Sequence, residues 1–144
     1  MRQKITWVAT FDGAAARVFA LKRAPPAKLS EIEWARREGP HKPHFDDAPP
    51  RTISSTDARR SAIDPKTDPE RRLETKFVEG FTAFLDEQGA AGAFDHLIIV
   101  AGARALGAFR TAAPKTLLAK VKDERVGDYV NADEARLLAA VLEN

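Results

Sequence analysis

The segment from Phe94 to Ala101 constrains the fold of this chain most strongly. It reads Phe-Asp-His-Leu-Ile-Ile-Val-Ala, and its second half is continuously apolar. Such a strand is typical of a parallel sheet covered on both faces, because neither face can then carry polar side chains. Parallel neighbours are joined by crossovers, which are usually helices. The segment, which is followed by Gly102, therefore predicts an α/β fold.

The N-terminal part of the chain predicts an antiparallel hairpin. Residues 4–12 and 14–22 are two runs rich in β-branched and aromatic side chains, and they flank the turn pair Asp12-Gly13. Residues 29–36 follow as a third strand with weaker, charged alternation, which suits a sheet edge. A short helix is the alternative interpretation of residues 29–36.

Residues 68–89 predict a long amphipathic helix. Asp68 is expected to cap it, and Pro69 fits its first turn, where a missing N–H costs nothing. The apolar stripe consists of Leu73, Phe77, Phe81, Phe84 and Leu85. Gly80 lies inside this helix at a cost of about 1 kcal/mol relative to alanine, which predicts close packing against it.

The C-terminal part alternates helix and strand. A short helix is predicted over 103–111, and Pro114 stops or restarts it. Residues 121–130 predict a weak fifth strand. Asn131 is expected to cap the last helix, with Glu134 three residues further on, as in a capping box.

These elements give the order βββαβαβα. A three-stranded meander followed by crossovers predicts one mixed five-stranded sheet with strand order 3-2-1-4-5, which is a ribonuclease-H-like arrangement. At 144 residues the chain is expected to form a single domain. A proline-rich loop at 37–66 interrupts it, and a connection of this length is typically functional or disordered.

Composition excludes several classes of protein. The formal net charge of +2 is a mild basic excess, and the absence of cysteine removes disulfides and thiolate chemistry. No apolar run approaches the roughly 20 residues of a membrane span, and the N-terminus lacks a signal sequence, so we expect a cytoplasmic protein without membrane contact.

No catalytic constellation is visible. A ribonuclease-H-like nuclease needs carboxylates converging on metal ions, but Asp12 ends the first strand and the fourth strand ends without an acid. His41, His44 and Asp46 supply three metal ligands at most, and solvated loop histidines are the commoner explanation. His96 begins a buried strand and is interpreted as a strand-end residue. We expect no enzyme, metal or cofactor.

Anion binding has better support. Helix N-termini with nearby arginines form phosphate sites, and open α/β sheets bind ligands at the carboxyl ends of their strands. The residues predicted to contact nucleic acid are Arg59, Arg60, Lys66, Arg71, Arg104 and Arg110. The alternative is that interleaved acids such as Asp64 and Asp68 pair with these cations on a solvated surface.

Four segments resemble the bacterial host attachment protein family. They are Trp7–Phe19, Asp68–Arg71 followed by Phe77, Gly92–Ala101 with Leu106–Arg110, and Asp128–Asn131. The family usually has a proline pair after the central strand, whereas this chain has Gly102-Ala103. Such proteins are similar to the middle domain of archaeal and eukaryotic peptide-release factors, which implies a ribonuclease-H-like fold and an RNA or ribosome partner.

The resemblance implies a non-catalytic binding module rather than a peptide-release activity, because the Gly-Gly-Gln loop of release factors is absent. Contact with RNA or the ribosome is the leading hypothesis. The alternative is a protein-interaction or regulatory module that is involved only indirectly in host attachment. That module would dock a partner through the 37–66 loop or the edge of the third strand.

Overall fold

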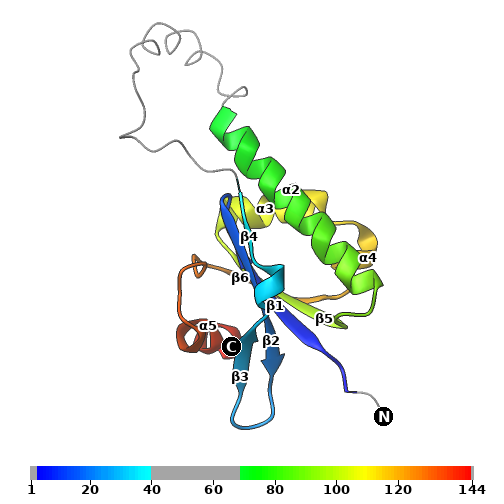
Figure 1. The fold of residues 1–144 in the computed structure, drawn as a ribbon, viewed down its shortest axis with the longest axis vertical. Coiled ribbons are helices and arrows are strands. Elements are labelled where there is room, and N and C mark those ends of the chain that lie inside the picture. Colours follow the sequence, from blue (N-terminus) through cyan, green and yellow to red (C-terminus); the bar gives the residue numbers. More distant parts are fainter. Residues whose placement is uncertain (1–2, 40–68, 144) are drawn as a thin grey trace, which may run out of the picture.

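The computed structural model describes residues 3–39 and 69–143 of the 144-residue chain (Figure 1). The strands are β1 (Thr6–Phe11), β2 (Ala15–Lys22), β3 (Lys28–Glu31), β4 (Arg37–Glu38), β5 (His96–Ala101) and β6 (Val121–Val126). The helices of the described part are the 3-10 helix η1 (Glu33–Ala35), α2 (Pro69–Ala90), α3 (Ala103–Ala112), α4 (Lys115–Leu118) and α5 (Glu134–Leu142). The predicted helix cap at Asp68 and the histidines of the 37–66 loop lie outside the described residues.

The strands form one mixed sheet, which confirms the α/β class. The path is β3-β2-β1-β5-β6, and the short strand β4 pairs with β2 beside β3. The hairpin of β1 and β2 is antiparallel as predicted, and β5 is parallel to both β1 and β6. In the described part of the chain the sheet has six strands instead of the five predicted, because Arg37 and Glu38, which follow η1, pair with β2 as a short extra strand.

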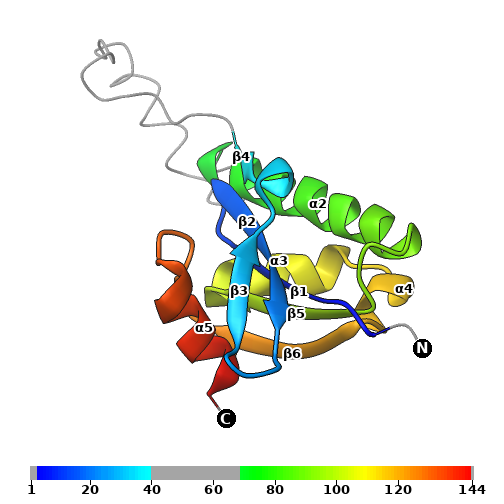
Figure 2. The same ribbon diagram turned by 60° about the horizontal axis from the view of Figure 1, so that its bottom comes forward.

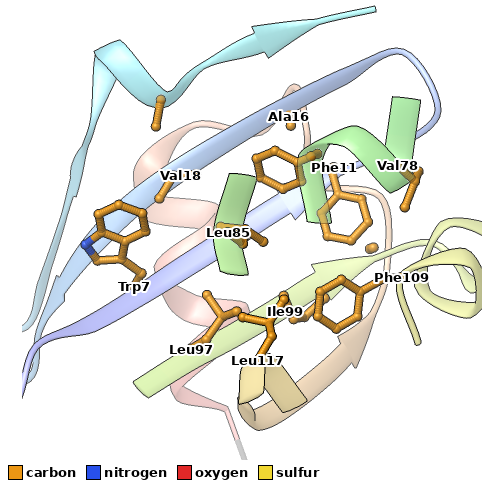
Figure 3. Close-up of a cluster of buried hydrophobic side chains, with 14 of the residues drawn as sticks. Trp7, Phe11, Ala16, Val18, Val78, Leu85, Leu97, Ile99, Phe109 and Leu117 are labelled. Carbon is orange, nitrogen blue, oxygen red and sulfur yellow. The ribbon is translucent and has the colours of Figure 1, made fainter. Parts of the chain in front are cut away.

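Helices cover both faces of the sheet. In Figure 2, α2 lies along one face and α5 across the other. The core under α2, α3 and α4 is the larger and is rich in aromatic rings (Figure 3); it includes Trp7, Phe11, Phe81, Leu85, Leu97, Phe109 and Leu117. The core under α5 consists of Val8, Phe19, Leu29, Ile98, Val100, Leu137 and Val141. Consecutive residues of β1 and β5 thus alternate between the two cores, as the strand period of two requires.

The predicted third strand, residues 29–36, is wrong in its second half. β3 ends at Glu31, and η1 follows with hydrogen bonds from Ala35 N to Ile32 O and from Arg36 N to Glu33 O. The turn carries the small side chain of Ala35 into the core, where it is fully buried, and leaves Trp34 on the surface. The short helix considered as the alternative describes this half of the segment better.

The stripe of α2 is also shifted from its predicted position. Phe81 and Leu85 are buried as expected, but Val78 and Thr82 complete the buried face and Leu73 is half exposed. Within residues 3–39 and 69–143, Gly80 does not pack closely against anything, because a Cβ added to it would meet none of their atoms within 4 Å. The prediction of close packing at Gly80 is therefore wrong.

Replacing Gly80 with alanine is expected to stabilise the protein by up to about 1 kcal/mol. The added methyl group has free space, and alanine loses less backbone entropy than glycine in a helix interior. Urea unfolding followed by circular dichroism measures the change. Gly13→Ala is the matched control and should destabilise, since its Cβ would stand 2.5 Å from the Cγ of Glu74. A destabilised Gly80→Ala variant would contradict the prediction.

Two C-terminal predictions need correction. The predicted strand 121–130 ends at Val126, and Tyr129 and Val130 lie in the segment that follows. Asn131 does not cap the last helix. Asp133 does so, with its Oδ1 accepting a hydrogen bond of 2.8 Å from Arg136 N. The reason is that Ala132 is itself buried and Ala132 N bonds to Tyr129 O, so the chain is still in a turn at Asn131.

Candidate functional site

A cavity of about 470 Å³ opens at the carboxyl ends of the parallel strands. Asp12 follows β1, Gly102 follows β5 and Asp128 lies just beyond β6, and all three residues line it. The first half of α2 contributes Glu74, and the first turn of α3 contributes Arg104. This edge, next to the point where the sheet changes from parallel to antiparallel pairing, is where open α/β sheets commonly bind ligands.

Asp12 is held in place by the hairpin turn. Its Oδ1 accepts hydrogen bonds of 2.8 Å from the backbone amides of Ala14 and Ala15, and Asp12 N donates to Ala15 O at 3.0 Å. The hairpin pattern alone explains these bonds, because aspartate commonly bonds to backbone amides two or three residues on. One oxygen of this carboxylate is therefore structural.

Gly13 lets α2 approach the hairpin. A Cβ at this position would lie 2.5 Å from Glu74 Cγ and 2.6 Å from Glu74 Cβ, distances that real side chains do not adopt. The Asp12-Gly13 pair forms the predicted hairpin turn and thus also has a second role. The missing side chain of Gly13 leaves space for the Glu74 side chain at the mouth of the cavity.

Glu74 forms an ion pair with Arg104, with 3.1 Å between Oε1 and Nη1. The Arg104 side chain is two-thirds exposed, so the pair is solvent-screened and its stabilisation is small. Arg104 stands in the first turn of α3, whose N-cap is Gly102 and which no side chain caps. The unbonded amides of that turn and the helix dipole give this wall of the cavity a positive character.

The three predicted cationic residues that the structure describes do not gather at one site. Arg104 lines the cavity, but Arg110 is in the last turn of α3, six residues or about 9 Å along the helix axis. Arg110 hydrogen-bonds to Glu124 of β6, which raises the pKa of Arg110. Arg71 is exposed near the start of α2. The other three predicted contacts (Arg59, Arg60 and Lys66) lie outside the described residues.

Reasoning from the sequence considered Asp12 in the test for a nuclease site but did not predict the acidic side of the cavity. Asp12, Glu74 and Asp128 come together there, although they are more than fifty residues apart in sequence. For Asp12 the available signal was its position directly after a predicted strand, whereas Asp128 gave no such signal because the predicted strand 121–130 extended past it. Among residues 3–39 and 69–143, no three acidic or histidine side chains are arranged so that they could hold a metal ion.

One family model matches residues 7–141, and its description is "Protein required for attachment to host cells". The chain belongs to this family. The match includes all the cavity residues, from Asp12 to Asp128, and confirms the predicted membership of the host attachment family. No curated protein matches the chain. None of the helices in the described part is long and apolar enough to cross a membrane.

Proposed function

We propose that this host attachment family protein is a non-catalytic cytoplasmic module that binds the phosphate backbone of RNA, free or in the ribosome, at the cavity. The observation that carries the proposal is the position of Arg104 beside an uncapped helix N-terminus. Backbone amides and a guanidinium together form a common phosphate-binding arrangement.

The carboxylates of the cavity influence how strongly a phosphate can bind there. Asp12 already accepts two backbone hydrogen bonds, and Glu74 is neutralised by Arg104. A phosphate would have to replace Glu74 as the partner of Arg104. The existing pair is exposed on its Arg104 side and weak, so breaking it costs little, but the freed Glu74 carboxylate then repels the phosphate. Glu74 then acts as an internal competitor that limits the affinity for anions.

We also propose that the fold is ribonuclease-H-like and related to the middle domain of peptide-release factors. The strand path β3-β2-β1-β5-β6, with a meander leading into crossovers, supports this assignment. Peptide release is not part of the proposal, because the chain has no Gly-Gly-Gln sequence.

Arg104→Ala is expected to weaken binding to a structured RNA by about three- to tenfold at low salt. It should also flatten the salt dependence by about one phosphate contact. Glu74→Gln should strengthen binding, because it frees Arg104 without removing it. Filter binding with a labelled ribosomal RNA hairpin between 25 and about 200 mM salt measures both effects.

The matched control for this experiment is Arg23→Ala. Arg23 is an exposed arginine just beyond β2, at the opposite end of the sheet from the cavity. Arg23→Ala removes the same net charge as Arg104→Ala. An equal loss of RNA affinity in the two variants would show that only the overall charge of the protein matters. Absence of any RNA affinity at the lowest salt would refute the proposal outright.

A further inference from the structure

The outward edge of α2 carries apolar side chains that the fold does not fully bury. The face that packs on the sheet includes Phe81 and Leu85. Leu73 is 50% exposed, and Phe77 and Phe84 are only partly buried beside that face. All three were part of the apolar stripe predicted from the sequence, so the stripe is wider than the fold requires. In Figure 2, α2 lies on the outside of the sheet, where this edge can meet another molecule.

The residues of this edge recur with the spacing of a helix-packing seam. Leu73, Phe77, Gly80 and Phe84 follow one another at intervals of four, three and four residues, which places them along one line of the helix. We refer to these four residues as the α2 seam. Two helices pack side by side along seams with this spacing. The α2 seam is therefore suited to contact another helix.

Gly80 allows a second helix to approach closely. It is exposed, and among the described residues no atom lies within 4 Å of the place where its Cβ would be. A glycine in a helix interior costs about 1 kcal/mol relative to alanine, and here no internal packing requires it. Because it has no side chain, the backbone of another helix can come near it. Gly80 thus marks the point where two helices would cross.

The charges beside the seam favour a second copy of α2 that runs antiparallel. Arg72 and Lys76 lie in the first half of the helix, and Glu87 follows Phe84 in the second half. All three are exposed, and none has an ion-pair partner among residues 3–39 and 69–143. An antiparallel copy brings the basic half against the acidic half, whereas a parallel copy would bring like charges together.

The position of Gly80 sets the register of this pairing. With the two Gly80 residues on a two-fold axis, Glu87 lies opposite Leu73 of the second copy. It is then about 1.5 Å along the helix axis from Arg72 of that copy and about 4.5 Å from Lys76. Both distances are within reach of long basic side chains. The two-fold symmetry repeats these contacts at the other end of the seam.

Trp34 extends the apolar surface beside the seam. It lies in η1, is 61% exposed, and its ring centroid is 6.0 Å from that of Phe84. Arg37 lies over the Phe84 ring, with its guanidinium carbon 4.3 Å from the ring centroid, and so covers one face of it. Exposed tryptophans are the side chains that most often anchor protein interfaces. In the antiparallel arrangement Trp34 would pack beside the first half of the second copy's α2.

We propose that the α2 seam binds a second copy of this chain, with the two α2 helices antiparallel and crossing at Gly80. The apolar surface is small, so the dimer forms at high protein concentration. The cavity is lined by Glu74, Thr75 and Val78 of α2, and none of these belongs to the seam. Dimer formation is therefore independent of the RNA contact proposed for the cavity.

Sedimentation velocity of the full chain between about 1 µM and about 1 mM tests the proposal. We expect a concentration-dependent equilibrium between monomer and dimer. Trp34→Ala should weaken self-association about five- to tenfold, because both copies lose the ring. Glu87→Lys should weaken it about tenfold or more, because it sets like charges against Arg72 and Lys76 at both ends of the seam. A protein that stays monomeric over the whole range would overturn the proposal.

A charge-reversal experiment tests the antiparallel arrangement directly. The double variant Arg72→Glu/Lys76→Glu should lose self-association as Glu87→Lys does. An equimolar mixture of the two variants should recover the dimer, because each copy then presents the charges that the other needs. Recovery in the mixture also shows that both variants are folded. A mixture that associates no better than either variant alone would overturn the proposed pairing.

Three further variants complete the test. Gly80→Ala, which is expected to stabilise the monomer, should weaken the dimer, because two methyl groups would meet at the crossing point. Val126→Ala is the matched control, since Val126 is 68% exposed on β6 and its truncation should leave self-association unchanged. Arg104→Ala should also leave it unchanged, which separates this proposal from RNA binding. An equal loss in Val126→Ala and Trp34→Ala would overturn the assignment to the α2 seam.

Discussion

Phe11→Ala is expected to destabilise the protein by about 3–5 kcal/mol, the largest effect of any substitution considered. Phe11 is 1% exposed, and its ring lies 5.3 Å from that of Phe81 and 6.0 Å from that of Phe109. It therefore joins β1 to both α2 and α3 at the centre of the larger core (Figure 3). Removing the Phe11 ring leaves a cavity between β1, α2 and α3, and all three elements would have to move to fill it.

Urea denaturation of Phe11→Ala and of Val126→Ala gives the comparison. Val126 is exposed, so its truncation should change the free energy of unfolding by no more than about 0.5 kcal/mol. Phe11 also precedes Asp12, so the variant is expected to loosen the cavity as well. A loss below about 1 kcal/mol in Phe11→Ala would mean that the aromatic core is not packed as described.

Arg17→Met is expected to cost about 2–4 kcal/mol. Arg17 is a largely buried residue of β2, and its Nη1 donates to the carbonyl oxygens of Val130 and Ala132 at 2.9 and 3.0 Å. Its Nη2 donates to Glu31 Oε1 at 2.8 Å. Methionine keeps the apolar stem but leaves two carbonyls and a carboxylate short of a donor. Hydrogen exchange should show that the segment leading into α5 loosens first.

The Arg17–Glu31 pair also predicts a pH dependence. Hydrogen bonds from Arg17 and then from Arg36 lower the pKa of Glu31 from 4.5 to about 2. A lowered folded-state pKa adds stability above the unfolded value, and this stability is lost as the pH falls from about 4.5 towards 2. After allowance for solvent screening the loss is about 1–2 kcal/mol.

Glu31→Gln is the control for that pH dependence. Its free energy of unfolding should fall less steeply than that of the unaltered protein between pH 5 and about pH 2, because the titrating group is gone. Arg17→Met should show a reduced slope, since Arg36 still holds Glu31. Identical slopes in all three proteins would contradict the assigned role of the pair.

Sequence patterns predicted the helices, strands and turns that form because of residues close to one another in the sequence. The apolar run of β5, the turn pair at Asp12-Gly13 and the periodicity of α2 each depend on neighbouring residues, and each element formed. Even so, local reasoning erred where a tertiary contact competes. Asn131 is a good cap by residue type, but the buried Ala132 and the bonds from Arg17 keep the chain in a turn until Asp133.

Local residue patterns and the family resemblance were enough to predict the α/β class, the hairpin, the two-faced burial of the central strands and membership of the host attachment family. The tertiary fold, in contrast, sets which side chains meet. It paired Arg104 with Glu74, separated Arg104 from Arg110, brought Asp128 to the cavity and left Trp34 exposed on a rigid turn. Periodicity records which face a residue occupies, whereas a site depends on contacts between segments that the sequence places far apart.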